Sequence, residues 1–138
     1  MIENQVFITS RDAERLRGLV NRLRKTGQCP DDDLEQLEQR VEMARVIDAE
    51  DIPRSVVTMN SLVGLRNLQA NEKFSCSVTY PEEADLIKRK VSVATPLGRA
   101  LLGSRVGDTI ECPIESGTRA LRVERVYYQP EAARDFHL

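Results

Sequence analysis

The spacing of apolar residues changes from a helical to a strand period near residue 54, and this change constrains the fold more than any other feature of the sequence. Before it, apolar residues recur every three or four positions; after it, they alternate with polar residues. Such a switch predicts helices followed by a sheet, an α+β organisation. With 138 residues, the chain has room for one ordinary domain, or for one small domain with an appendage. We therefore predict a helical unit over residues 1–51 and a sheet unit over residues 52–138, connected around Pro53.

The first unit is predicted to be an antiparallel two-helix hairpin. Thr9 and Ser10 offer N-caps and Gly27 offers a C-terminal stop, which places the first helix at about 10 to 26. A second helix is predicted at about 31 to 48. Because the connection is only a few residues long, the helices must run antiparallel and bury their apolar seams against each other as a short coiled coil. The seam residues are Ala13, Leu16, Val20 and Leu23 in the first helix and Leu34, Leu37, Val41 and Ala44 in the second.

The two predicted helices carry opposite charge. Six basic and two acidic residues lie between Arg11 and Lys25, whereas seven acidic residues and two arginines lie between Asp31 and Asp48. Opposite charges on the flanks of a hairpin favour one register, and each exposed pair contributes about 0.2 to 1 kcal/mol. The whole chain has a net charge of only −2. We therefore expect no direct binding of nucleic acid and no attachment to a membrane surface.

The second unit is predicted to be a small antiparallel sheet with one short helix. Strands are predicted at residues 62–68, 74–80, 91–93, 106–114 and 120–128. The apolar phase breaks near Glu124, which predicts a β-bulge there. Thr95 as N-cap, Pro96 as first helical residue and Gly103 as stop define the helix. Its expected buried residues are Leu97, Ala100 and Leu101.

No arrangement of catalytic or metal-binding residues is visible in the sequence. The single histidine, His137, has no carboxylate or serine placed beside it, so a catalytic triad is not predicted. The three cysteines, Cys29, Cys76 and Cys112, lack the spacing of a zinc site and suit a reducing compartment. No export signal or membrane-spanning run is apparent either. We expect a cytoplasmic protein that is not an enzyme and uses no metal or cofactor.

Three consecutive carboxylates, Asp31, Asp32 and Asp33, mark the start of the second predicted helix. Acidic residues in a first turn interact favourably with the free N–H groups and the helix dipole, and this structural role is the favoured interpretation. The alternative depends on their position at the tip of the hairpin, where no other part of the chain is expected to cover them. Carboxylates on such a finger could supply ligands to a Mg²⁺ held in the active site of a partner.

Two groups of motifs resemble known families. Residues 95–103, TPLGRALLG, followed by VGD at 106–108, resemble the C-terminal part of the bacterial Gre transcript-cleavage factors. Residues 56–61, VVTMNS, and 128–133, YQPEAA, are similar to the regulator of nucleoside diphosphate kinase family, of which the chain is identified as a member. This resemblance implies an FKBP-like fold for the second unit and docking on RNA polymerase at the rim of its secondary channel.

The resemblance also implies which residues make the contact. Thr95 and Pro96 correspond to the Ser-Pro pair with which Gre factors touch the polymerase rim, and Leu97 and Arg99 lie beside them. The acidic residue that commonly precedes the Ser-Pro pair is Ala94 here, a departure from the family pattern. The simpler interpretation, that Thr95 and Pro96 only cap a helix, stays open beside this one.

The predicted hairpin is short for a Gre-like factor. Its arms of 15 to 17 residues would reach about 25 Å, whereas Gre factors use longer arms to bring acidic residues to the polymerase metal. We therefore expect competition with Gre factors at the channel entrance rather than transcript cleavage. Two alternatives remain. One is control of nucleoside diphosphate kinase by direct contact; the other is prolyl isomerase activity, for which the second unit offers few aromatic residues, namely Phe74, Tyr80, Tyr127, Tyr128 and Phe136.

Overall fold

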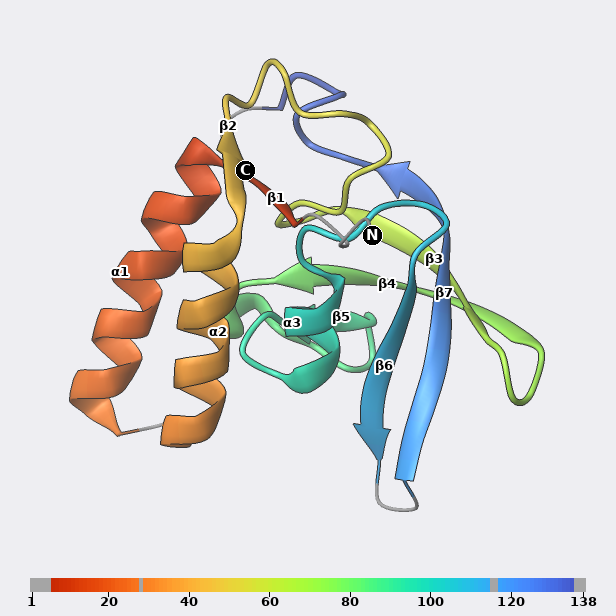
Figure 1. Ribbon diagram of the computed structural model, residues 1–138, viewed down its shortest axis with the longest axis horizontal. Helices are drawn as coiled ribbons and strands as arrows, with labels where there is room; N and C mark the ends of the chain where they lie inside the picture. Colours follow the sequence, from red (N-terminus) through yellow and green to blue (C-terminus); the bar gives the residue numbers. More distant parts are fainter. Residues whose placement is uncertain (1–5, 28, 115–116, 136–138) are drawn as a thin grey trace.

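The computed structural model describes residues 6–27, 29–114 and 117–135, so His137 and Phe136 lie outside the described residues. Two long helices stand beside a curled sheet, with a short helix between them (Figure 1). The mixed α+β class is thereby confirmed. In chain order the elements are β1 (Phe7–Thr9), α1 (Ser10–Thr26), α2 (Asp31–Met43), β2 (Arg45–Ile47), β3 (Leu62–Asn67), β4 (Glu72–Thr79), the 3₁₀ turn η1 (Pro81–Glu83), β5 (Lys90–Ser92), α3 (Pro96–Leu101), β6 (Thr109–Ile114) and β7 (Gly117–Tyr128).

Helix α1 has the bounds that the sequence predicts. Thr9 is the N-cap, and its side-chain oxygen accepts a hydrogen bond from the Asp12 N–H at 3.1 Å. At the other end, Gly27 has a φ of 68° and donates its N–H to the Leu23 carbonyl. A left-handed residue at this position favours glycine, because other residues carry a Cβ that is crowded there. Both ends of α1 are thus fixed by local chemistry.

Helix α2 ends at Met43, five residues before the predicted end at 48, and the prediction is wrong there. Ala44 is already extended, with a φ of −73° and a ψ of 149°, and the Arg45 N–H donates to the Val6 carbonyl at 2.8 Å. Residues 45–47 then form β2, which pairs in parallel with β1. This pairing satisfies backbone groups that a longer helix would have used.

Helices α1 and α2 form the predicted antiparallel hairpin (Figure 1). Leu16 and Val20 of α1 and Leu37 and Val41 of α2 are all buried, so both apolar seams are covered. The predicted attraction between the arms is visible in one exposed ion pair, with 3.1 Å between Arg24 Nη2 and a Glu38 carboxylate oxygen. Coiled-coil geometry in the strict sense stays a prediction.

The main sheet has the strand order β5-β4-β3-β7-β6. All of its neighbours are antiparallel except β4 and β5, which are parallel, so the prediction of an antiparallel sheet is wrong at that pair. Residues 80–89 return the chain to the level of Ser77 in β4. Strand β5 therefore begins with Lys90 paired to Ser77 and runs in the same direction as β4. The comparison with an FKBP-like fold stays a prediction.

Strand β7 carries two irregularities in its pairing with β3. Glu124 lies between the β7 residues that pair with Gly64 and Leu65 and has no pairing partner of its own in β3, which confirms the bulge predicted there. Tyr127 is skipped in the same way nearer the end of the strand. Bulges add twist, and the curl of the sheet is visible in Figure 1.

Most of the buried apolar residues form one cluster, which includes residues of both predicted units. Ile8, Leu16 and Leu37 come from the hairpin side, and Val63 and Leu101 come from the sheet side. The hairpin therefore packs on the rest of the protein and does not stand free along its whole length. The division into residues 1–51 and 52–138 stays a prediction.

Candidate docking site

The start of helix α3 is the part of the predicted site that solvent reaches. Thr95 is exposed and is the N-cap, as predicted: its hydroxyl oxygen accepts the Gly98 N–H at 3.2 Å and donates to the Ser92 carbonyl at 2.6 Å. Pro96 is the first helical residue, and its side chain is half-buried, like that of Leu97. Because the cap already occupies the Thr95 hydroxyl, this residue can offer a partner its methyl group and its fixed position.

A glycine brings α3 against strand β5. A Cβ placed on Gly98 would lie 2.1 Å from the Ser92 carbonyl oxygen and 3.0 Å from the Val93 Cα. Only a residue without a side chain permits this approach. Gly98 therefore sets the distance between α3 and the sheet, and with it the position of Thr95 and Pro96.

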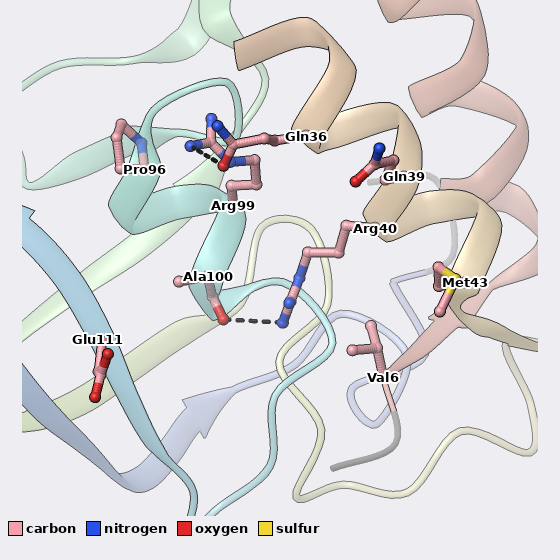
Figure 2. Close-up of a pocket in the computed structure, with 9 residues that line it drawn as sticks. All are labelled: Val6, Gln36, Gln39, Arg40, Met43, Pro96, Arg99, Ala100 and Glu111. Carbon is pink, nitrogen blue, oxygen red and sulfur yellow. Dashed lines mark hydrogen bonds between the residues drawn. The ribbon is translucent and has the colours of Figure 1, made fainter. Parts of the chain in front are cut away.

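Arg99, which the resemblance places beside Thr95 and Pro96 in the contact, is only 8% exposed and does not share the exposure of Thr95. Its Nη1 lies 3.3 Å from the Asp33 carboxylate and 3.2 Å from the Ala94 carbonyl oxygen. Its Nη2 donates to the Gln36 side-chain oxygen at 3.3 Å (Figure 2). A buried guanidinium needs such partners, because leaving its donors unpaired costs free energy. Arg99 thus joins α3 to the first turns of α2.

A second arginine joins the same two helices from the other side. Arg40 of α2 donates Nε to the Leu102 carbonyl at 2.8 Å and Nη2 to the Ala100 carbonyl at 3.0 Å. These carbonyls lie at the C-terminal end of α3, where a cation is favourable. Burial, and next the positive charge of Arg99, lower the pKa of Arg40 from its ordinary value. Both arginines hold α3 against α2: the Arg99 guanidinium lies next to the Ala94 carbonyl before α3, and Arg40 binds the carbonyls at the C-terminal end of α3.

Between α2 and α3 lies an open groove of about 460 Å³. Arg40 and Arg99 reach across it, Pro96 lies at one end, and Met43 with Val6 lies at the other (Figure 2). Met43 is 79% exposed. The groove therefore begins at the α3 start and offers a mixed polar and apolar surface next to Thr95.

The three tip carboxylates do not behave alike. Asp31 and Asp32 are exposed, whereas Asp33 is half-buried and pairs with Arg99. The expectation that no other part of the chain covers the tip is therefore wrong for Asp33. The N-cap of α2 is Pro30, which provides no side-chain hydrogen bond, so acidic residues in this first turn complement the helix dipole.

Asp12 is a second buried charged residue at the junction of hairpin and sheet. It is 2% exposed, and its Oδ2 accepts the Met59 N–H at 3.2 Å. Thr58, the residue before Met59, donates its hydroxyl to the Glu131 carboxylate at 2.6 Å. Burial, and next the charge of Glu131, raise the pKa of Asp12 to about 7. This junction therefore changes its charge near neutral pH.

The internal roles of Arg40 and Asp12 were not predicted, although the sequence contains a signal for each. Arg40 is one of two arginines in an otherwise acidic segment, and Asp12 is one of two acids in an otherwise basic helix. A residue whose charge opposes that of its own helix is a candidate for an interaction with another element. Among the described residues, no three His, Cys, Asp or Glu side chains are grouped as a metal site would require. Nor does any described helix have the length and apolarity needed to cross a bilayer.

Comparison with known proteins gives the context of this site. Residues 52–128 match the family of the C-terminal domain of the transcription elongation factors GreA and GreB. The chain is 37% identical over 134 residues to "Regulator of nucleoside diphosphate kinase" of Escherichia coli strain K12, with 96% of both chains covered.

Two further relatives carry Gre names. GreA of Alkaliphilus oremlandii is 33% identical over 96 residues, which span 70% of this chain and 60% of that protein. A solved structure, described as a GreA/GreB elongation factor from Nitrosomonas europaea, is 38% identical, superposes with a TM-score of 0.76, and covers 91% of this chain and 100% of its own. The α3 start and the sheet thus lie within the part shared with Gre factors.

Proposed function

The chain belongs to the regulator of nucleoside diphosphate kinase family, related to the GreA/GreB elongation factors, and from this membership we propose that it binds RNA polymerase at the entrance of the secondary channel. It is a Gre-like, transcription-related regulator. Bound there, it would compete with Gre factors without cleaving transcripts. The alternative that the family name raises is control of nucleoside diphosphate kinase through direct contact.

The observation that carries the proposal is the exposed and rigid start of α3. Thr95 is exposed and Pro96 half-buried, inside the region shared with Gre factors. Gly98 fixes this segment against β5, and Arg99 fixes it against α2. A contact surface that is already ordered loses little conformational entropy on binding. We therefore assign the contact to Thr95, Pro96 and Leu97, and we assign Arg99 a positioning role.

The hairpin supports competition rather than cleavage. Helix α1 has 17 residues and α2 has 13, which correspond to about 26 Å and about 20 Å at 1.5 Å per residue. Asp33, one of three tip carboxylates, is turned towards Arg99. A short finger with one acid engaged inside the protein is poorly suited to deliver ligands to a distant metal.

The test is direct binding to purified RNA polymerase by fluorescence anisotropy. A variant with Thr95→Ala and Pro96→Ala should bind at least about tenfold more weakly if these residues form a contact centre. The matched control is Glu14→Gln, on the exposed side of α1, which should bind like the wild type. Equal affinity of the wild type and of a folded Thr95/Pro96 variant would remove this site from consideration.

The same labelled protein tests the kinase alternative. Titration with nucleoside diphosphate kinase instead of polymerase should give no change in anisotropy if polymerase is the direct partner. Binding to the kinase, without binding to polymerase, would favour the alternative that the name of the 37% identical relative suggests.

A further inference from the structure

Two adjacent aliphatic side chains stand almost completely in solvent. Leu86 is 87% exposed and Ile87 is 95% exposed, in the segment between η1 and β5. Single exposed apolar residues are common on protein surfaces and need no explanation. Leu86 and Ile87, two large ones side by side, form a small contiguous apolar tip, and contiguous exposed apolar surface marks interaction sites where scattered residues do not.

The turn that carries this tip is held by its own backbone. Asp85 and Lys90 exchange two N–H to carbonyl hydrogen bonds, of 2.9 and 2.8 Å. The Asp85 carboxylate also accepts the N–H groups of Ile87 and Lys88, at 3.0 and 3.3 Å. The two apolar side chains are therefore presented from an ordered turn, which reduces the entropy lost on binding.

Acidic residues precede the tip along the chain, and basic residues follow it. Glu82 and Glu83 precede it and are exposed, whereas Lys88 and Arg89 follow it and are exposed. Because these charges balance, the turn has little attraction for an anionic membrane. Two aliphatic side chains per copy also cannot supply the ~1,200 Å² that stable interfaces bury, so pairing of two tips would be weak. A different protein, with a complementary pocket, suits the tip better.

The tip lies close along the chain to the proposed contact at α3. Thr95 follows Ile87 by eight residues, so the tip and the α3 start lie at most about 29 Å apart. A standard interface covers about 800 Å² on each partner, which is broad enough to include both. One partner could therefore touch the tip and the α3 start together.

We propose that Leu86 and Ile87 form a second contact on the protein that binds the α3 start, by entering an apolar pocket whose rim is acidic where it faces Lys88 and Arg89. The identification of this partner as RNA polymerase rests on the proposed function. The contact itself rests on exposure, order and charge at the tip. Apolar anchors that fill a pocket commonly dominate binding, whereas rim charges mainly affect the association rate.

The test compares polymerase affinity for three variants of the full chain. Leu86→Ser with Ile87→Ser should weaken binding at least about tenfold while thermal unfolding stays unchanged, because neither side chain is packed in the core. Lys88→Glu with Arg89→Glu should slow association, most strongly at low salt. Val46→Ser, a change at a 45% exposed residue of β2, is the matched control and should bind like the wild type.

The possible results separate the two proposals. If the Thr95/Pro96 variant loses affinity but the folded Leu86/Ile87 variant stays within twofold of the wild type, the tip contact is wrong and the proposed function stands. If the wild type does not bind polymerase, both proposals fail. Binding of the wild type, but not of the Leu86/Ile87 variant, to phosphatidylserine-containing vesicles would assign the tip to a membrane and overturn the protein contact.

Discussion

Replacing the buried Asp12 with Asn should change how the stability of the protein depends on pH. The wild-type carboxyl has a pKa raised from 3.8 to about 7, first by burial and next by the charge of Glu131. Arg15 and Tyr80 also lie near it, and the Arg15 guanidinium carbon lies 4.4 Å from the centroid of the Tyr80 ring. Asn keeps an oxygen that can accept the Met59 N–H but cannot ionise.

The sign of the effect follows from the direction of the shift. A carboxyl with a raised pKa holds its proton more tightly in the folded state than in the unfolded state. Its contribution to stability is therefore present at low pH and is lost as the pH rises through the folded pKa. For a shift from 3.8 to about 7, the free energy of unfolding should fall by about 2 to 3 kcal/mol between pH 5 and pH 8.

Urea unfolding followed by circular dichroism at pH 5, 6, 7 and 8 measures this change. From pH 5 to pH 8, the free energy of unfolding of Asp12→Asn should rise by about 2 to 3 kcal/mol relative to that of the wild type. Glu14→Gln, an exposed change in the same helical turn, is the control and should follow the wild type. Glu131→Gln should lower the Asp12 pKa and move the transition to lower pH.

Parallel pH profiles for wild type and Asp12→Asn would refute this reasoning. Such a result would mean that Asp12 is ionised in the folded protein at pH 5, and that burial does not control its charge. A carboxyl NMR titration of Asp12 in the wild type would then give a pKa near 4 instead of near 7.

Two substitutions test the packing of α3. Gly98→Ala should destabilise the protein by about 1 to 3 kcal/mol in urea unfolding, since its Cβ would meet the Ser92 carbonyl; unchanged stability would mean that α3 can move away from β5 without loss. Arg99→Gln should lower the free energy of unfolding by about 1 to 3 kcal/mol. A double-mutant cycle with Asp33→Asn should give a coupling energy of at least about 0.5 kcal/mol, and strictly additive effects would mean that the two side chains do not pair.

Elements defined by local chemistry could be predicted from the sequence. The cap at Thr9 and the stop at Gly27 fix α1, and Thr95 with Pro96 fixes the start of α3. The bulge at Glu124 was also predictable, because one extra residue shifts the apolar phase of a strand. In each case the signal lies within a few residues of the feature.

Features that depend on distant partners could not be predicted in this way. Strands β1 and β2 have three residues each, too few for a period, and their pairing joins segments far apart in the sequence. The burial of Arg99 depends on Asp33 and Gln36 of another helix, while a charged residue in a short helix is by default expected at the surface. The exposed Thr95 and the buried Arg99 therefore belong to one sequence motif, and only the folded structure shows that the first faces solvent while the second pairs with α2.

The most direct test of the central claim uses stalled, backtracked elongation complexes with a GreA-type factor present. Adding increasing amounts of this protein should reduce factor-stimulated transcript cleavage to the polymerase's own rate, and the protein alone should produce no cleavage. The variant with Asp31→Asn and Asp32→Asn should compete equally well, because these two carboxylates are exposed and the proposed contact lies at Thr95, Pro96 and Leu97 instead. Undiminished cleavage at saturating protein, or cleavage by the protein alone that the Asn changes abolish, would contradict the account.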